Sequence, residues 1–330
     1  MKKIINNPDQ VVDEMLDGLV FSYDKLVERI PETMVVHRKA EKKNKVGLVS
    51  GGGSGHEPSH AGFVGKGMLS AAVAGQMFTS PTPDQVLEGI KASDEGEGVF
   101  LVIKNYTGDV MNFEMAQEMA ELEDIEVETV VVNDDIAVED STFTAGKRGI
   151  AGTVLVHKIL GAAAEDGKSL KEIKELADKL IPNIKSIGVA LSPATNPEVG
   201  EPGFEIEEDE IEFGVGIHGE PGYRREKLQP SKDLAKELVD KLKSEFEWSK
   251  DDEYAVLVNG MGATPLMEQF IFMNDVKELL VDEESLSLSF KKVGDYMTSI
   301  DMEGLSLTLV KLKDSEWLDY LKAPEETISW

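Results

Sequence analysis

The first half of the chain alternates between short apolar runs and segments whose apolar residues recur at helical spacing. The apolar runs are rich in valine and leucine and are bounded by turn-forming or charged residues, which is typical of buried strands in a parallel sheet. They occupy residues 46–49, 69–74, 98–104 and 127–132. Helical spacing is found in residues 8–23, 84–92, 153–164 and 170–180. The alternation predicts an α/β fold with a doubly wound, mostly parallel sheet and right-handed crossovers.

The second half of the chain has a different order of predicted elements. A strand at residues 187–191 is followed by an acidic segment, residues 198–212, which we expect to be an exposed linker or hairpin. Helix, strand, helix, strand and strand then follow at residues 234–246, 254–258, 266–280, 286–291 and 305–311. This mixed order predicts a second, smaller mixed α/β domain. We expect a domain boundary at Pro182, which divides the chain into residues 1–182 and 183–330. Residues 317–330 are expected to return and pack on the first domain.

The composition restricts the class of protein. The chain has 330 residues, enough for two domains, and no cysteine, which excludes disulfides, thiolate metal sites and a cysteine nucleophile. Its net charge of −29 argues against nucleic-acid binding, because phosphate contacts need clustered lysine and arginine. A solvated acidic surface is the simpler meaning of that charge. The sequence has no segment like a signal peptide and no apolar run of membrane-spanning length, so we expect a soluble cytoplasmic protein without a membrane partner.

Residues 46–58 carry the most distinctive local pattern, a short apolar strand that runs into Ser-Gly-Gly-Gly-Ser-Gly-His-Glu-Pro. Four glycines within five positions permit positive φ angles and let a ligand approach the backbone closely. We predict that a helix follows, with His56 at its start and Pro58 in its first turn. A strand, a glycine-rich turn and a helix form the usual ligand crevice of a parallel α/β sheet.

Two familiar glycine motifs do not fit this stretch. A Walker loop requires a lysine after its last glycine, and none follows Gly55, while a dinucleotide fingerprint would need a third glycine where His56 stands. A tight turn with an incidental histidine remains the alternative. A ligand site is favoured because Ser80, Lys104 and Asp109 also follow predicted strands, and ligands of such sheets bind beyond the carboxyl ends of the strands.

A second glycine-rich segment, residues 214–219, satisfies Gly-x-Gly-x-x-Gly, but its context does not support a dinucleotide site. The residues that follow begin with Glu-Pro-Gly and cannot open the helix that would hold a pyrophosphate. We interpret the segment as a loop that presents the imidazole of His218, which can act as a nucleophile towards a carbonyl carbon. A buried histidine in a turn is the alternative.

The sequence resembles the substrate-binding subunit of the bacterial dihydroxyacetone kinases along nearly its whole length. The matching segments are LVSGGGSGHEP at 48–58, FTSPTP at 78–83, KNYTGD at 104–109, EFGVGIHGEPG at 212–222, NGMGATP at 259–265 and TSIDM at 298–302. The resemblance implies that His218 forms a covalent hemiaminal with dihydroxyacetone, which would distinguish this ketone from glycerol, a polyol without a carbonyl.

The resemblance also implies roles for the other candidate residues. Asp109 and His56 would form the acid/base pair, with Asp109 on the attacking hydroxyl and His56 on the hemiaminal oxygen or its neighbour. The predicted substrate-binding residues are Gly53, Ser54, Gly55, His56, Ser80, Lys104 and Asp109. Ser80 is a weaker candidate, because its role could be limited to shaping the loop.

The phosphoryl donor is expected on another protein. This chain has no Walker loop, no kinase glycine loop with its lysine and no acidic pair placed for magnesium, so we expect it to bind no metal and no cofactor. The resemblance implies a partner subunit that holds ADP or ATP with magnesium and is recharged by a phosphocarrier protein of the phosphoenolpyruvate-dependent phosphotransferase system. It implies a homodimer as well.

Two other functions remain open at this point. A paralogue with the same fold and covalent ligand site could be a ligand sensor that acts as a transcriptional coactivator. The presence of both His56 and Asp109 favours the enzyme over this sensor. An enzyme of aldolase or isomerase type could use the same carbonyl capture without phosphoryl transfer, and it would need no partner.

Overall fold

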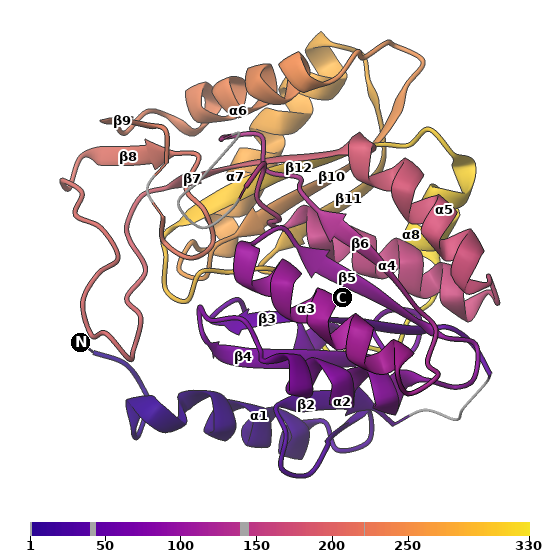
Figure 1. Cartoon of the computed structure of the whole chain (residues 1–330). Coiled ribbons are helices and arrows are strands. Elements are labelled where there is room, and N and C mark those ends of the chain that lie inside the picture. Colours follow the sequence, from indigo (N-terminus) through magenta and orange to yellow (C-terminus); the bar gives the residue numbers. More distant parts are fainter. Residues whose placement is uncertain (1, 40–43, 139–144, 221) are drawn as a thin grey trace.

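Figure 1 shows the computed structural model of the chain, which describes residues 2–39, 44–138, 145–220 and 222–330. Its framework is two six-stranded sheets with helices packed on both faces of each. No helix in these described ranges is long and apolar enough to cross a membrane.

The first sheet has the strand order β1-β2-β4-β3-β5-β6. Its strands are β1 (Val27–Arg29), β2 (Val35–Arg38), β3 (Gly47–Ser54), β4 (Ala71–Met77), β5 (Val99–Lys104) and β6 (Val127–Val132). Strands β4, β3, β5 and β6 run parallel, and β1 and β2 add an antiparallel edge. The prediction of a mostly parallel sheet is therefore confirmed.

Successive residues of a strand point to opposite faces of the sheet, and in these strands the residues on both faces are apolar. Helices therefore pack on both faces of this sheet. On one face Val49 packs with α2 (Pro83–Ser93) and α3 (Thr107–Glu121). On the other face Leu48 packs with α1 (Val11–Ser22), α4 (Gly152–Glu165) and α5 (Leu170–Leu180). The connection that follows β3 lies on this second face. Helix α3, which follows β5, lies on the first face. The chain therefore leaves these two adjacent strands towards opposite faces of the sheet. Such a switch point is where ligands bind in doubly wound sheets.

The second sheet has the order β11-β10-β12-β7-β8-β9, and only β10 and β11 are parallel. Its strands are β7 (Ile184–Ala190), β8 (Glu210–Phe213), β9 (Arg224–Lys227), β10 (Glu253–Gly260), β11 (Ser287–Gly294) and β12 (Gly304–Lys311). The mixed topology was predicted, but the sheet has as many strands as the first. The polar edge strand β9 has no apolar pattern, and β8 lies at the end of the segment predicted as an exposed linker or hairpin.

The second sheet shares one core with the first half of the chain. Helices α6 (Ser231–Glu245) and α7 (Leu266–Lys277) cover one face, while Ala255 and Leu257 of the opposite face pack in the same cluster as α4. Helix α4 is buried on all sides, as expected for a helix that is apolar around its circumference. After α8 (Ser315–Lys322), the backbone N–H groups of Ile328 and Ser329 donate to Gly62 O. The domain boundary at residue 182 stays a prediction.

One local prediction is wrong. Strand β3 continues through the glycines to Ser54, and no helix begins at His56 or Pro58; the next helical turn is a 3₁₀ segment, Ala61–Phe63. The physical reason is that the carbonyl groups of residues 55–57 all bond to a distant part of the chain, which fixes the course of the backbone after Ser54. These carbonyl groups accept from Ile300 N at 2.8 Å, Thr298 N at 3.2 Å and Thr298 Oγ1 at 2.9 Å. Locally, His56 O accepts a turn bond from Ser59 N at 3.0 Å rather than an α-helical one.

The partner segment, residues 295–300, is itself fixed by Asn259 near the end of β10. The Asn259 Oδ1 atom accepts the N–H groups of Tyr296 and Met297, both at 2.9 Å. Its Nδ2 donates to Met297 O at 2.8 Å, and the side chain is fully buried. Asn259 therefore connects the second sheet to the loop that follows β3.

Replacing Asn259 with alanine should lower the free energy of unfolding by at least about 2 kcal/mol, because buried backbone groups lose their partners. Urea unfolding measures this, with Asn274→Ala as the matched control. Asn274 is exposed, and among the described residues its side chain bonds to Glu278 alone, at 3.3 Å, so its loss should cost under about 0.5 kcal/mol. Equal losses in the two variants would contradict the anchoring role of Asn259.

Candidate functional site

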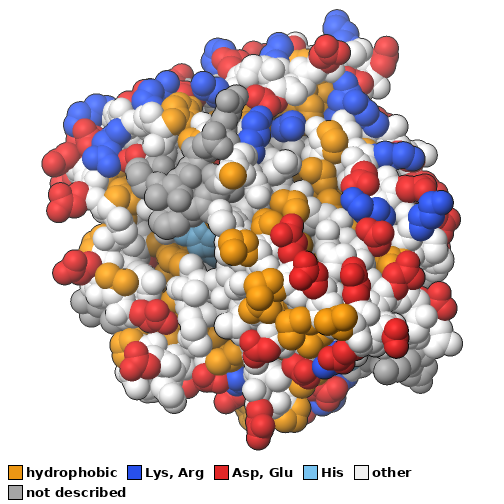
Figure 2. All heavy atoms as spheres, in the orientation of Figure 1, with side chains coloured by type: hydrophobic (Ala, Val, Ile, Leu, Met, Phe, Trp, Pro, Cys, Tyr) orange, Lys and Arg blue, Asp and Glu red, His pale blue; other side chains and the backbone are white. Residues whose placement is uncertain are grey.

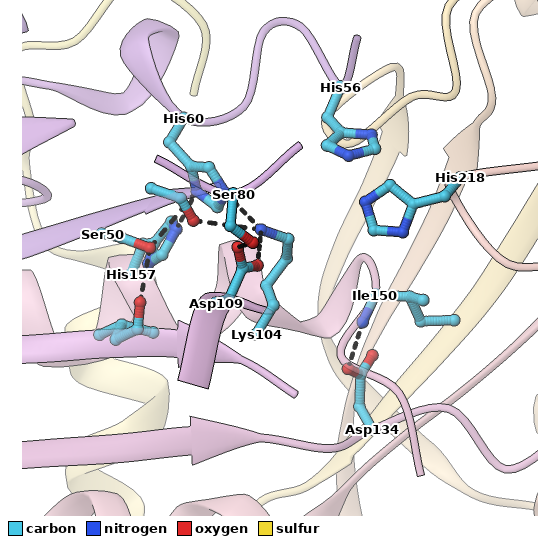
Figure 3. A network of polar contacts seen from close by, with 12 residues as sticks. Ser50, His56, His60, Ser80, Lys104, Asp109, Asp134, Ile150, His157 and His218 are labelled. Carbon is cyan, nitrogen blue, oxygen red and sulfur yellow. Dashed lines mark hydrogen bonds and ion pairs between the residues drawn. The ribbon is translucent and has the colours of Figure 1, made fainter. Parts of the chain in front are cut away.

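The two histidines singled out in the glycine-rich segments lie side by side. His56 follows β3, and His218 lies on the loop between β8 and β9. Their ring centroids are 4.8 Å apart, with an interplanar angle of 66°. Figure 3 shows the two imidazoles facing each other beside Lys104. On the molecular surface a histidine is visible at the bottom of a hollow (Figure 2).

Two aromatic side chains complete the surroundings of the His218 ring. Tyr106, just before α3, packs edge-on at a centroid distance of 4.3 Å, and Phe78, after β4, does so at 5.4 Å. Phe78 also stacks on His56 at 5.3 Å. Sequence analysis missed both residues, since an aromatic residue in a loop gives no signal of its partner. The rings hold the two imidazoles at a fixed mutual angle.

His56 is a neutral imidazole with one nitrogen free for a ligand. Its Nδ1 lies 2.8 Å from Thr298 O, and a carbonyl can only accept, so Nδ1 carries the proton. Burial is the main reason that the pKa of His56 lies well below its ordinary value, and the nearby side chains of His218 and Lys104 lower it further. Its Nε2 is buried and has no hydrogen-bond partner in the described residues. A buried acceptor without a partner marks a position where a ligand donor fits.

Lys104, Asp109 and Ser80 form a second group beside the imidazole pair (Figure 3). The fully buried Lys104 Nζ lies 3.3 Å from Asp109 Oδ2 and 3.1 Å from Gly51 O. Ser80 donates its hydroxyl to Asp109 Oδ1. Asp109 lies in the first turn of α3, where the helix dipole favours negative charge. Helix α3 begins at Thr107, so the connection between β5 and α3 is short.

Behind Lys104 lies a buried pair of histidines that sequence analysis did not assign to the site. Lys104 Nζ contacts His60 Nε2 at 3.2 Å, and His60 Nδ1 contacts His157 Nε2 at 3.0 Å. Burial, followed by the charge of Lys104, lowers the pKa of both rings, that of His157 to about 3. Both are therefore neutral near pH 7, and His60 can accept a hydrogen bond from the ammonium group. Among the described residues, no three acidic or histidine side chains are grouped as metal ligands.

The glycines of β3 make room for this ammonium group. A Cβ atom on Gly52, whose φ is +151°, would lie 2.2 Å from Lys104 Nζ, and one on Gly53 would lie 2.6 Å from Thr79 N. The hydroxyl of Ser54 donates to Gly75 O at 2.7 Å, and Gly55 O accepts from Ile300 N at 2.8 Å. The predicted residues Gly53 and Gly55 therefore contribute space and backbone atoms beside the site, while Ser54 holds the end of β3 through its hydroxyl.

Glu220 is a further residue of the site that sequence analysis missed. Its Oε2 accepts the backbone N–H of His218 at 3.0 Å, and its Oε1 lies 3.6 Å from His218 Nδ1. Burial alone would raise the pKa of Glu220, but the adjacent His218 side chain and the charge of Arg148 lower it to about 2. The HGEPG motif contained the residue, but spacing alone does not reveal where its carboxylate lies.

Comparison with known proteins identifies relatives over the full chain. Residues 17–329 match the Dak1 domain family. The chain is 65% identical over 329 residues to the PTS-dependent dihydroxyacetone kinase, dihydroxyacetone-binding subunit DhaK of Lactococcus lactis subsp. lactis (strain IL1403), covering 100% of this chain and 99% of that protein.

Two solved structures have the same fold. The dihydroxyacetone kinase operon co-activator Dha-DhaQ matches with a TM-score of 0.91 and 46% identity, over 96% of this chain and 97% of that one. The dihydroxyacetone kinase of C. freundii in complex with AMP-PNP and Mg²⁺ matches with a TM-score of 0.90 and 36% identity. That match covers 100% of this chain and 60% of the C. freundii chain.

Gly52→Ala should destabilise the protein by about 1–3 kcal/mol, because the new methyl group strains the backbone and displaces Lys104 from its acceptors. Gly18→Ala is the matched control. Gly18 lies in α1, where a methyl group would meet no described atom within 4 Å outside the helix backbone, so alanine there should be neutral or slightly stabilising. Urea unfolding compares the two variants. A Gly52→Ala protein as stable as Gly18→Ala would contradict the close fit around Lys104.

His157→Gln should flatten the loss of stability in acid. The pKa of His157 is about 3 in the folded protein, below the ordinary value of about 6.5, so between these values the unfolded chain binds more protons and stability falls as pH falls. This group alone accounts for a loss of about 2 kcal/mol between pH 7.5 and pH 5. Glutamine keeps a hydrogen-bond acceptor for His60 without titrating. Unfolding curves at both pH values measure the difference, and parallel pH dependence in the two proteins would refute it.

Proposed function

The chain belongs to the family of Dak1 domain proteins, and we propose that it is the dihydroxyacetone-binding subunit of a phosphoenolpyruvate-dependent dihydroxyacetone kinase. The observation that carries the proposal is the pair of imidazoles 4.8 Å apart, next to a buried lysine–carboxylate pair. The relative that is 65% identical along its whole length supports the same function.

His218 captures the substrate covalently in this proposal. Its Nε2 lone pair bonds to the central carbon of dihydroxyacetone, and the π electrons of the carbonyl move to its oxygen. That oxygen gains a proton, and the ring, which becomes cationic on forming the bond, loses its Nδ1 proton, so the neutral hemiaminal is balanced. Nε2 of His56, which lacks a partner among the described residues, accepts a hydrogen bond from the new hydroxyl or a neighbouring one. Glycerol cannot react because it has no carbonyl carbon.

Asp109 prepares the captured substrate for phosphoryl transfer. It takes the proton from the terminal hydroxyl as that oxygen attacks phosphorus. Lys104 and Ser80 hold its two carboxylate oxygens, so the base is fixed before the substrate arrives. The reaction is thus transfer of a phosphoryl group to an alcohol, with dihydroxyacetone phosphate as the product.

The phosphoryl group comes from a partner subunit that binds ADP or ATP with magnesium and is recharged by a phosphocarrier protein. One relative supports a separate donor. The name of the L. lactis relative describes it as one subunit of a PTS-dependent kinase. The protein works as a cytoplasmic homodimer, and light scattering of the purified chain should give twice the monomer mass.

A ligand-sensing coactivator is the second candidate, because the co-activator Dha-DhaQ shares the fold at a TM-score of 0.91. The greater identity to the kinase subunit, 65% against 46%, favours the enzyme. The two functions differ in one observable. A sensor binds dihydroxyacetone but yields no product with any nucleotide-binding partner.

Intact-protein mass spectrometry and a coupled assay with the partner subunit test the proposal together. His218→Ala should lose the added mass of dihydroxyacetone, whereas His37→Ala, on β2 outside the site, should keep it. Asp109→Ala should keep the adduct and lose turnover by at least about 100-fold, the usual cost of removing a general base. An adduct that survives in His218→Ala would refute the nucleophile, and near-normal turnover of Asp109→Ala would move the base to His56.

A further inference from the structure

The carboxylate of Glu220 lies directly against the His218 side chain. The two residues share one tight loop, and Glu220 bonds to the backbone of His218 while facing the ring at Nδ1. The Glu220 side chain is only 5% exposed. A carboxylate in this place can act on the two nitrogens of the ring differently, because only Nδ1 faces it.

Glu220 is ionised in its buried position. With its pKa near 2, it carries a full negative charge at neutral pH. The neighbouring Tyr106 phenol remains protonated, since burial, and after it the charge of Glu220, place its pKa well above the ordinary value. A buried anion next to an imidazole favours the tautomer with its proton on the nearer nitrogen, because the N–H dipole then points at the charge.

The loop has space for this carboxylate because residue 216 is a glycine. A Cβ atom on Gly216 would lie 2.2 Å from Glu220 Oε2 and 2.7 Å from Arg148 Nη1, so only glycine leaves room for both charged groups. Arg148 is fully buried and donates to Gly214 O at 2.7 Å and to Asp135 Oδ2 at 2.8 Å. The positive charge beneath the loop is therefore fixed, and it stabilises Glu220 in its ionised form.

We propose that Glu220 is the positioning residue of the nucleophile: it holds the proton of His218 on Nδ1, leaves the Nε2 lone pair free for the carbonyl carbon, and stabilises the positive ring formed by the addition. This inference deepens the proposed capture by His218 and rests on it. The proton stays on Nδ1 while the N–C bond forms and the carbonyl oxygen takes up the electron pair. The proton leaves the ring when that oxygen is protonated.

The present distance suits a group that acts during the addition. At 3.6 Å, Oε1 is beyond hydrogen-bond length from Nδ1, and a shift of about 0.7 Å would close the bond once the ring becomes positive. Hydrogen bonds of catalytic groups are commonly long before the substrate is bound. Glu220 Oε1 has no hydrogen-bond partner within the described chain, so it is available for this bond.

Glu220→Gln in the full-length chain separates this role from a merely structural one. Glutamine can still accept the His218 backbone N–H through its amide oxygen, but it has lost the charge. Nitrogen-15 NMR of the ligand-free protein, with the His218 signals assigned through His218→Ala, should show the Nδ1–H tautomer in the wild type and a mixture in the variant. The rate of formation of the dihydroxyacetone adduct, followed by mass spectrometry over time, should fall by at least about tenfold, since the positive ring formed during the addition loses a charge-assisted contact.

Glu212→Gln is the matched control. Glu212 is equally buried and accepts the N–H of Gly222 at 3.0 Å in the same loop, but it pairs with Arg225 and does not face His218. The Glu212→Gln variant should leave the tautomer of His218 and the rate of adduct formation unchanged. If Glu220→Gln does not fold, Glu220→Asp takes its place: it keeps the charge on a shorter side chain, so it should retain the Nδ1–H tautomer and form the adduct more slowly.

Three results would overturn the inference. One is a Glu220→Gln protein with the wild-type tautomer and the wild-type rate of adduct formation. Another is an equal slowing in Glu212→Gln, and the third is a mixed tautomer in the ligand-free wild type. Failure of the proposed function is distinguishable, because the wild type would then form no adduct at all. The tautomer of His218 is measured without ligand and tests Glu220 in either case.

Discussion

The hydrogen bonds between residues 55–59 and residues 296–300 are the constraint on which the site depends. They join the end of the central strand of the first sheet to a loop of the second sheet, through Ile300 N, Thr298 N and the Ser59 hydroxyl. The same junction bonds Nδ1 of His56 to a backbone carbonyl. Each bond contributes only about 1 kcal/mol net, but together they fix which nitrogen of His56 faces the ligand. The tautomer of His56 is therefore set by the way the two halves of the chain meet.

Charge is distributed in the site so that each ionised group has a partner and the free groups are neutral. Lys104 is paired with Asp109, and Arg148 stabilises the charge of Glu220. His56, His60 and His157 have a lowered pKa because burial disfavours their charged form. An unpaired charge in such a place would cost several kcal/mol. Neutral His56 can accept a proton or a hydrogen bond from the ligand. The buried anions can stabilise positive charge that develops nearby.

Much of the fold could be predicted from the sequence. Residues 127–132 and 170–180 were predicted with the bounds of β6 and α5, because each is a strong pattern ended by polar or turn-forming residues. The glycine stretch was interpreted incorrectly, since its course after Ser54 is decided by bonds to residues 296–300, which no local pattern contains. Strand β9, made only of charged residues, pairs at a sheet edge where apolar alternation is absent.

The candidate site was predictable as far as its motifs extend. Ser80, Lys104 and Asp109 follow strands whose carboxyl ends must meet, and the structure brings them into contact. His56 and His218 were linked through a resemblance, since nothing local shows that the β8–β9 loop reaches the first sheet. Tyr106, Phe78 and Glu220 could not be assigned, because their importance lies in which atoms they face across the fold.

The most direct test of the account is a crystal structure of the chain soaked with dihydroxyacetone. The account predicts continuous density between Nε2 of His218 and the central carbon of the ligand, with a ligand hydroxyl within hydrogen-bond distance of Nε2 of His56. A terminal hydroxyl should lie next to the carboxylate of Asp109. Dihydroxyacetone bound without a covalent link to His218, or bound away from the pair of imidazoles, would contradict it.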